Sequence, residues 1–232
     1  MCIRTSRWPL ELSTRSLTIE KMHVVIALTK CTSYEKRDRM LSLLGPVAHT
    51  TIANEPECFA YAWFKSDVEN AVPDRYLRGL EVYKSEKALS QTHRSTPEYK
   101  AFRSAVVPEG ITELPTDLRP LTPAGIGYLS LVDDETVQFG GATKDEVIIV
   151  VRRFCTADSA RREEVKRDLM GAVEKLLAAS TPGEGEQLRG VVKSFWCLEY
   201  APDLQDGTVV TFERYMNRMG MERVAVLLRD DL

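Results

Sequence analysis

Histidines are the side chains best suited to move a proton near neutral pH, and this 232-residue chain has three of them. His93 is the leading candidate, placed after a strand-like segment at 76–83. It serves either as a general acid–base group or as a structural tie, hydrogen-bonding the loop after that strand to the next helix. His49 falls near the end of a predicted helix and His23 opens a predicted strand, so both are weaker candidates.

Aromatic side chains on two predicted strands are candidates for a pocket wall. Tyr61 and Trp63 share one face of the strand at 58–64 by period-two alternation, and Tyr83 ends the strand at 76–83. Such a wall suits a flat polycyclic ligand, and a tyrosine hydroxyl can stabilise a phenolate. The alternative is that these aromatic residues belong to an ordinary core.

Four further residues are weaker candidates. Asn54 and Arg75 stand in predicted loops, where they either orient ligand oxygens or face solvent. Trp196 and Tyr215 lie on strands of the second half and fit core or interdomain packing better than ligand contact. The candidate site is therefore concentrated in the first half of the chain.

The charge balance excludes several kinds of partner. Lys and Arg total 31 against 34 acidic residues, so the formal net charge is −3. Nucleic acids and anionic membranes both favour a concentrated basic footprint, so neither is an expected partner. The longest apolar runs, at 24–28 and 147–151, are too short to span a membrane. A neutral, aromatic small molecule fits this composition better.

No motif for a cofactor or a metal is present in the sequence. It has neither a GxGxxG segment nor a P-loop, and its histidines lack the carboxylate spacing of a metal site. The five cysteines are scattered without a CxxC pair, which favours reduced thiols in a cytoplasmic protein. Residues 1–21 lack the apolar segment of a secretory signal and are expected to form a loose tail, with organelle targeting as the alternative.

Hydrophobic patterning places the candidate residues on alternating strands and helices. In the first half we expect a strand at 23–29, a helix at 34–44 that Ser33 caps and Pro46 kinks, strands at 58–64 and 76–83, and helical segments at 85–91 and 97–106. Four prolines between 108 and 123 mark a connector, 108–144, which includes a possible fourth strand at 127–132.

The same order of elements begins again after the connector. In the second half we expect a strand at 146–154, a helix at 160–179 capped by Asp158 or Ser159, strands at 191–199 and 208–215, and a helix at 221–228. Two divergent copies of one unit, at 22–107 and 145–232, explain this repetition.

One such unit makes a ferredoxin-like, split βαβ sheet with helices on one face only. The first strand of each unit is apolar on both sides, so the other face of each sheet must also be covered. We therefore expect an α+β fold in which two ferredoxin-like units pack sheet to sheet as an α+β barrel within one chain.

Residues 80–102, LEVYKSEKALSQTHRSTPEYKAF, resemble the antibiotic biosynthesis monooxygenase (ABM) domain of the dimeric α+β barrel superfamily. In that family the third strand ends in a Glu-x-aromatic step, here Glu81 and Tyr83. A short helix with a histidine follows, and then a Ser/Thr-Pro step leads into an aromatic helix. Residues 51–61 are similar to the family's helix-to-strand junction, and the resemblance extends over 22–106.

The second copy resembles the family only in outline. It repeats the Glu-x-Tyr step at Glu213 and Tyr215, but residues 216–224 contain no histidine and no Ser/Thr-Pro step. Its fourth strand is also missing, so we expect a single catalytic pocket, in the first copy. Because family members commonly dimerise through their sheet faces, the resemblance implies a monomer with a pseudo-dimeric barrel or a homodimer.

The resemblance implies a cofactor-independent monooxygenase of natural-product biosynthesis, acting on a polyketide-like phenol or anthrone with molecular oxygen. His93 would be the base, and the substrate would contact Tyr61, Trp63, Tyr83, Asn54 and Arg75. A cyclase, isomerase or decarboxylase is the near alternative, because the same base and pocket serve other carbanion chemistry. A non-catalytic ligand-binding or stress-related barrel is the alternative from a different class.

Overall fold

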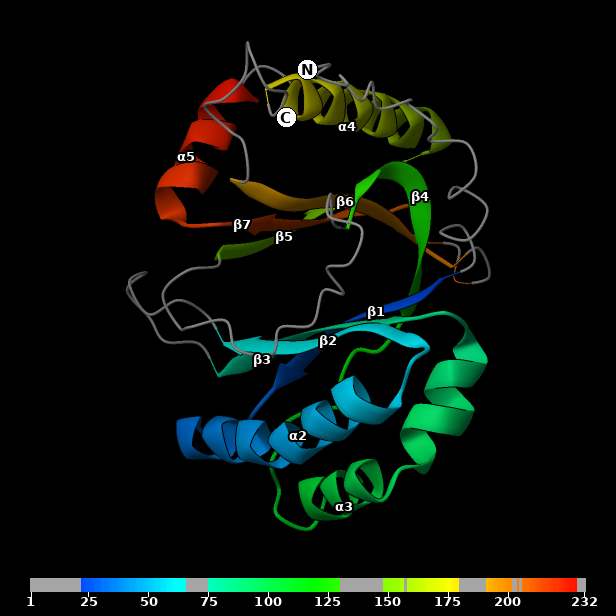
Figure 1. The fold of residues 1–232 in the computed structure, drawn as a ribbon, viewed down its shortest axis with the longest axis vertical. Helices are drawn as coiled ribbons and strands as arrows, with labels where there is room; N and C mark the ends of the chain where they lie inside the picture. The colour runs from blue at the N-terminus through cyan, green and yellow to red at the C-terminus, as the bar shows by residue number, and fades with distance from the viewer. Residues whose placement is uncertain are drawn as a thin grey trace, which may run out of the picture.

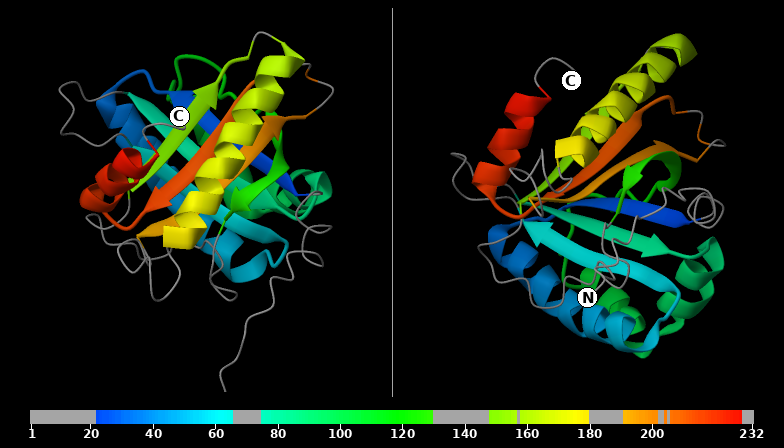
Figure 2. Two further views of the ribbon diagram at one scale, coloured as in Figure 1. Left: turned by 90° about the horizontal axis from the view of Figure 1, so that it is seen from above. Right: turned by 45° about the horizontal axis from the view of Figure 1, so that its top comes forward.

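The computed structural model describes residues 22–65, 75–129, 148–156, 158–179, 191–201, 204 and 206–228. Their strands form one seven-stranded sheet in the order β2-β3-β1-β4-β6-β7-β5, with every neighbouring pair antiparallel. The sheet curls so that its two halves face each other, and helices cover the outer side of each half (Figure 1, Figure 2). The predicted α+β barrel of two ferredoxin-like units is confirmed.

The first half contributes three strands and the helices on their outer face. In chain order its elements are β1 (His23–Lys30), α2 (Tyr34–Asn54), β2 (Cys58–Lys65), β3 (Tyr76–Tyr83), the π-helical turn η1 (Ala88–Thr92), the 3₁₀ turn η2 (His93–Ser95) and α3 (Pro97–Val106). Ser33 caps α2 as predicted, by accepting a hydrogen bond of 3.2 Å from the backbone nitrogen of Lys36.

The second half repeats this arrangement with fewer elements. They are β5 (Ile148–Phe154), α4 (Ser159–Ala179), β6 (Val192–Tyr200), β7 (Val209–Tyr215) and α5 (Arg218–Leu227). The Asp158 carboxylate accepts a hydrogen bond of 2.8 Å from the backbone nitrogen of Arg161 and so caps α4, one of the two predicted possibilities. In Figure 2, α4 and α5 both lie on the outer face of this half of the sheet.

Strand β4 (Pro120–Tyr128) joins the two halves, and it differs from the predicted fourth strand at 127–132. It pairs with β1 on one side and with β6 on the other. The register shifts between Pro123 and Gly127, so the strand bends between the two layers. Prolines are tolerated at a strand's start and at a bulge because neither position needs every backbone N–H, and this allows a strand to begin inside the proline-rich connector.

Side-chain alternation gives the sheet two buried faces. The inward faces of both halves share one apolar cluster, made of Val24, Ile26, Ala60, Leu80, Val82, Leu121, Trp196, Leu198, Tyr200, Val210 and Phe212. Residues between them in the sequence point outward, toward the helices of their own half. Trp196 is thus a core residue between the sheets, while Tyr61, Trp63 and Tyr83 lie on the helix side of the first half.

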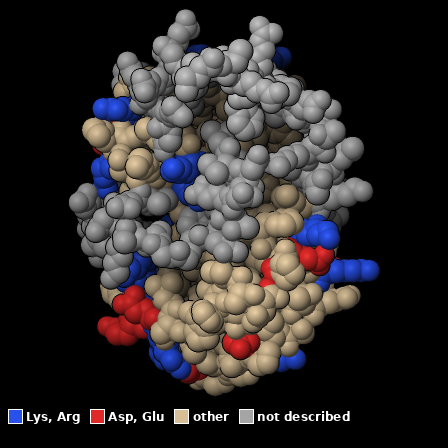
Figure 3. Space-filling view, viewed as in Figure 1, with Lys and Arg blue, Asp and Glu red and all other residues tan. Residues whose placement is uncertain are grey.

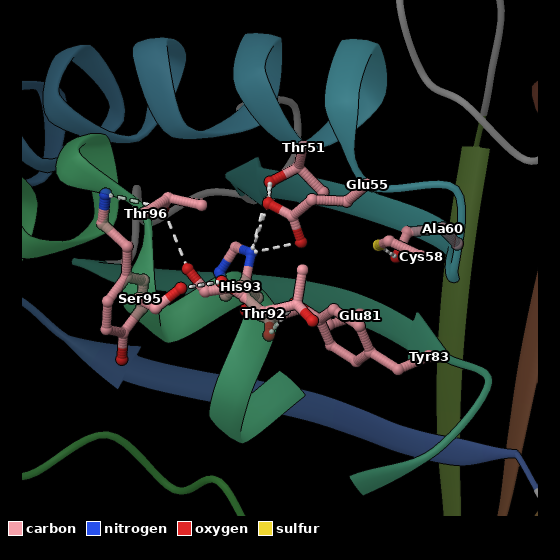
Figure 4. A network of polar contacts seen from close by, with 11 residues as sticks. Thr51, Glu55, Cys58, Ala60, Glu81, Tyr83, Thr92, His93, Ser95 and Thr96 are labelled. Carbon is pink, nitrogen blue, oxygen red and sulfur yellow. Dashed lines mark hydrogen bonds and ion pairs between the residues drawn. The ribbon is translucent and has the colours of Figure 1, made fainter. Parts of the chain in front are cut away.

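Helix α2 is longer than the sequence predicts. It continues through Pro46, where a kink was expected, and ends at Asn54, ten residues beyond the predicted end at Leu44. Buried Leu44, Val47 and Thr51 lie on both sides of the proline, so packing against the sheet offsets the cost of about 3 kcal/mol for an interior proline. The extra turns bring the end of α2 over the sheet, beside the segment that carries His93 (Figure 4).

Charge and hydropathy of the described residues add two observations. No helix in this part of the chain is long and apolar enough to cross a membrane. On the face in Figure 3, lysines and arginines are interspersed with acidic residues wherever the structure describes the surface.

Candidate active site

His93 is fully buried between α2 and β3 (Figure 4). Its Nδ1 atom lies 3.1 and 3.2 Å from the two carboxylate oxygens of Glu55 and 3.2 Å from the Thr51 hydroxyl oxygen. The Thr51 hydroxyl in turn donates to Glu55 at 2.9 Å. With acceptor oxygens around Nδ1, this nitrogen carries the proton of the neutral ring and leaves Nε2 as an acceptor.

Local structure fixes the backbone of His93 from both sides. Its N–H donates to carbonyls of η1, a single π-helical turn of a kind often found at functional sites. Its carbonyl accepts from the backbone nitrogen of Thr96 at 3.2 Å and from the Thr96 hydroxyl at 2.9 Å. Thr96 also caps α3, and Pro97 follows at the first helical position. The Ser/Thr-Pro step after His93 therefore holds the ring under α2.

Three tyrosines surround the imidazole. The ring centroids of Tyr61, Tyr83 and Tyr99 lie 5.1, 5.6 and 5.0 Å from that of His93. The Nε2 atom is buried and makes no hydrogen bond to the described residues. A buried acceptor without a partner costs about 1–3 kcal/mol, so Nε2 is the ring atom available to accept a hydrogen bond or a proton from a bound molecule.

Glu81 is the second buried carboxyl of this network. It lies on β3 with its side chain on the helix side, and the Tyr83 hydroxyl donates to it at 3.1 Å (Figure 4). Burial raises the pKa of Glu81, although the nearby His93 and the hydrogen bond from Tyr83 act in the opposite direction. A carboxyl with a raised pKa beside a histidine is a common arrangement in acid–base sites.

Burial also affects the tyrosines and the neighbouring thiol. It raises the pKa of the Tyr61 and Tyr83 hydroxyls well above the usual value, and the charge of Glu81 adds to the effect. Burial likewise raises the pKa of Cys58, with Glu55 contributing. All three groups therefore stay protonated near neutral pH, where the tyrosines can donate hydrogen bonds.

An aromatic cavity opens beside this network. Its lining includes Tyr61, Trp63, Glu81, Tyr99 and Phe102, and its volume is about 30 Å³. That is room for one or two waters, whereas drug-sized ligands occupy roughly 300–1,000 Å³, so a substrate must widen the cavity.

Gly79 provides space for part of the cavity wall. A Cβ at this position would lie 2.9 Å from the Trp63 ring, so the indole packs directly on the glycine backbone across the strand pair. Trp63 Nε1 is buried and makes no hydrogen bond of standard geometry to the described residues. It is nevertheless close enough to the Tyr61 hydroxyl to lower that group's pKa, against the larger effect of burial.

A second cavity, of about 200 Å³, reaches the network from the Glu55 side. It is lined by Glu55, Pro56, Glu57, Cys58, Ala88 and Thr92. Glu57 forms a surface ion pair with Lys84 at 2.8 Å. The His93 network thus lies between two openings, one aromatic and one at the carboxylate of Glu55. Among the described residues, no group of three His, Cys, Asp or Glu side chains is arranged to hold a metal ion.

The remaining sequence candidates lie outside this network. Asn54 is exposed at the end of α2. Arg75 precedes β3, at the opposite end of that strand from Tyr83, where it donates to the Thr32 carbonyl at 2.6 Å and pairs with Glu113 at 3.2 Å. These contacts give Arg75 a structural role.

The two other histidines are also separate from the His93 network. His49 lies within α2 and is exposed. His23 begins β1 opposite Tyr83 in the strand register. Burial lowers the pKa of His23, although Glu86 acts in the opposite direction.

The strand registers reveal the corresponding site in the second half. Glu81 lies opposite Val25 and Tyr61, and Glu213 lies opposite Val150 and Phe195. Two positions away along these strands, the small residues Ala27 and Gly79 lie opposite each other in the first half. Their counterparts in the second half are Arg152 and Thr211. Trp63, which lies opposite Gly79 on the other side, has Cys197 as its counterpart. Among these residues the two sites share the glutamate and tyrosine of the Glu-x-Tyr step and the valine opposite the glutamate, but not the residues around Gly79.

Glu213 is surrounded by hydrogen-bond donors. Arg152 contacts its two oxygens at 2.8 and 3.3 Å, Thr211 donates at 2.7 Å, and Tyr215 donates at 2.5 Å. In the first half the corresponding space holds Trp63 and the aromatic cavity. Arg152 and Thr211 are larger than their counterparts Ala27 and Gly79, and both donate hydrogen bonds to Glu213.

Sequence reasoning missed Glu55 and gave Glu81 no role of its own. The repeated Glu-x-Tyr step was an available signal for Glu81, because a glutamate on the buried face of a strand needs a reason. Glu55 had no such signal: it stands in an Asn-Glu-Pro-Glu turn, where an acidic residue is ordinary.

Comparisons with known proteins agree with this architecture. Residues 22–105 match the family model "Antibiotic biosynthesis monooxygenase" (ABM), and no curated protein matches the sequence. A "putative monooxygenase" from Fusobacterium nucleatum superposes with a TM-score of 0.65 at 12% identity, over 89% of this chain and 81% of that one. A "putative monooxygenase" from Lactobacillus acidophilus superposes with a TM-score of 0.63 at 13% identity, over 89% of this chain and 82% of that one.

These two likenesses show the fold along most of the chain, while the family match falls on the half that contains His93. Residues 22–105 therefore form a domain that matches the antibiotic biosynthesis monooxygenase family, and this domain is one of the two units of the barrel.

Proposed function

We propose that the protein is a cofactor-independent monooxygenase that oxidises an aromatic, polyketide-like phenol or anthrone in natural-product biosynthesis. The observation that carries the proposal is the buried His93, whose Nδ1 faces Glu55 while Nε2 has no partner among the described residues. Such a ring is oriented to accept a proton at Nε2. The match of residues 22–105 to the ABM family supports oxygenation as the reaction.

In the proposed reaction, His93 removes a proton from the activated CH₂ group of an anthrone, and the charged ring is stabilised by Glu55. The resulting carbanion supplies the electrons and adds O₂ to form a C–O bond. Protonation gives a hydroperoxide, which loses water to leave a carbonyl group. One oxygen atom stays in the product, the other leaves as water, and the substrate alone is oxidised. In this proposal Tyr61, in the lining of the aromatic cavity, donates a hydrogen bond to the developing phenolate, while Tyr83 donates to Glu81.

The halves of the molecule have different parts in this proposal. Residues 22–107 form the catalytic domain with the substrate contacts at Tyr61, Trp63 and Tyr83, and 108–144 connect it to 145–232, which act as a structural partner. The fused second unit takes the place of a second subunit, so one chain is a sufficient catalytic unit. We propose that it works in the cytoplasm on a small aromatic substrate and molecular oxygen.

An isotope experiment tests the reaction. The protein is incubated with emodin anthrone under labelled O₂, and incorporation of label into the new carbonyl is measured by mass spectrometry. His93→Ala should lower the rate by about 10²–10⁴-fold, the usual contribution of a general base. His49→Ala, on α2 of the same half, is the matched control and should react like the wild type.

Three results would contradict the proposal in different ways. A product without label would favour cyclisation, isomerisation or decarboxylation by the same base. An unchanged rate in His93→Ala would remove His93 from the chemistry. No turnover by the wild type would exclude this anthrone as a substrate, and binding without turnover would favour a ligand-binding barrel.

A further inference from the structure

Two arginines at the aromatic cavity have no ion-pair partner in the described part of the chain. Arg94, in η2, and Arg103, in α3, are exposed and belong to the lining of the cavity that contains Glu81. Neither makes an ion pair with the described acidic residues. Arg94 acts on Glu81 only by its charge, which lowers the pKa of that carboxyl against the larger effect of burial.

Other arginines of the first half behave differently. Arg39 makes two hydrogen bonds to Glu109, at 2.8 and 2.9 Å. Arg119 contacts Asp117 and Asp206 at 3.1 and 3.0 Å and stacks over Tyr200. The guanidinium groups of Arg39 and Arg119 are thus paired with carboxylates of the protein itself. Arg94 and Arg103 pair with no carboxylate of the described residues, although their planar forks are suited to bind carboxylate in two-point geometry.

We propose that Arg94 and Arg103 bind an anionic substituent of the substrate, so that the substrate class is an aromatic acid. The inference rests on the proposed function only in taking the aromatic cavity as the substrate site. The aromatic body packs against Tyr61, Trp63 and Phe102, and the carboxylate lies at the mouth between the two guanidinium groups. This revises the expectation of a neutral substrate that the overall charge suggested.

The buried acidic groups favour one orientation of such a ligand. Glu81 and Glu55 are enclosed near His93, and both would repel a carboxylate placed beside them. A substrate that carries its anion at one end and its reactive phenol or CH₂ group at the other avoids this repulsion. Its reactive end then faces His93. The rim arginines therefore select both the substrate class and its direction of entry.

Binding of a matched ligand pair tests the proposal without any turnover. The ligands are 6-hydroxy-2-naphthoate and 6-hydroxy-2-naphthamide, which share the ring and a phenol at the far end and differ in charge, and their affinities are measured by titration calorimetry. We expect wild type to prefer the carboxylate by about tenfold or more, the effect of one charge-assisted hydrogen bond. The preference should fall with added salt.

Variants locate the source of the preference. In the double variant Arg94→Gln/Arg103→Gln, the affinity for the carboxylate should fall to within about twofold of the affinity for the amide. The affinity for the amide itself should not change, because this ligand keeps its aromatic contacts. Arg223→Gln, an exposed arginine on α5, is the control and should keep the wild-type preference. Circular dichroism and thermal unfolding verify that each variant is folded.

Equal affinity of the wild type for both ligands would overturn the proposal, and so would a preference that survives in the double variant. Failure of the oxygenation test has a separate signature, since it leaves naphthoate binding and its dependence on Arg94 and Arg103 intact.

Discussion

At the scale of single residues, the His93 ring is defined by what surrounds each nitrogen. Nδ1 is within 3.2 Å of oxygens from Glu55 and Thr51, while Nε2 has no hydrogen-bond partner in the described structure. This asymmetry fixes the tautomer. Glu55 is a positioning residue in this description, because it acts on the substrate only through the imidazole.

Replacing the positioning carboxylate should change the tautomer of His93. In Glu55→Gln one acceptor oxygen becomes an amide nitrogen, which only donates, and the negative charge is lost, so the proton on Nδ1 loses a charge-assisted hydrogen bond. We expect the neutral ring to become a mixture of the two tautomers, which nitrogen NMR distinguishes by the chemical shifts of its two nitrogens. Glu57→Gln, at the surface pair with Lys84, should leave the ring unchanged. A pure Nδ1–H tautomer in Glu55→Gln would refute the positioning role.

The raised pKa of Glu81 predicts a pH-dependent cost to stability. Since its folded pKa lies above the ordinary value of 4.5, the folded state binds the proton more tightly than the unfolded state does. The free energy of unfolding is then highest while Glu81 is protonated and falls as pH rises from 4.5 through the raised pKa.

Glu81→Gln should remove that fall. We expect the stability of the variant relative to wild type to increase across the same pH window and then level off, as measured by urea denaturation at a series of pH values. Glu174→Gln, exposed on α4, is the control for a surface carboxyl. A stability difference that is constant with pH would show that burial does not raise the pKa of Glu81.

At the scale of elements, β4 determines how the halves are joined. It is the one described strand that pairs with strands of both halves, and its bend requires a positive φ of 84° at Gly127. The backbone there passes so close to β6 that a side chain would collide with the carbonyl oxygen of Phe195. Glycine is therefore needed for both the dihedral angle and the close approach.

Two alanine variants on β4 separate these needs. Gly125 also has a positive φ, of 74°, but nothing lies within 4 Å of an added Cβ. We expect Gly125→Ala to lower the free energy of unfolding by about 1–2 kcal/mol from the dihedral alone. Gly127→Ala should lower it clearly more, because the collision adds to the same dihedral cost. Equal losses in urea denaturation would mean that β4 shifts freely away from β6.

At the scale of the whole molecule, the two units share one interior. Their sheets bury a common apolar cluster to which both halves contribute, including Leu80 and Val82 from β3 and Val210 and Phe212 from β7. Separating the halves would expose that cluster to water on both sides. We therefore expect the barrel to unfold as one cooperative unit.

Tryptophan fluorescence can test this cooperativity. On a Trp8→Phe background, Trp63→Phe leaves Trp196 as the reporter between the sheets, and Trp196→Phe leaves Trp63 as the reporter at the cavity. Each variant's fluorescence transition in urea should coincide with its own far-UV circular dichroism transition, which follows both halves. A fluorescence midpoint clearly separated from the dichroism midpoint in either variant would show that the halves unfold independently.

Local patterns predicted most elements because their causes are local. The strand at 76–83 and the helix at 97–106 have the predicted bounds, since alternation, the Ser/Thr-Pro step and a cap are readable from neighbouring residues. Helix α2 and strand β4 were mispredicted around Pro46 and Pro120. In both places a proline that disfavours the element locally is outweighed by pairing or packing with residues far away in the sequence.

The sequence by itself determined the repeat, the family resemblance, the two-unit barrel and the choice of His93, because periodicity and motif spacing are properties of the chain. Only the tertiary structure joined Glu55 to His93, placed Glu81 in the cavity wall and put Arg94 and Arg103 at its mouth. It also showed that Arg152 and Thr211 donate hydrogen bonds to Glu213 in the second half, where the first half has Ala27 and Gly79. These outcomes depend on strand register and on where helices end, which bring together residues that no local pattern links.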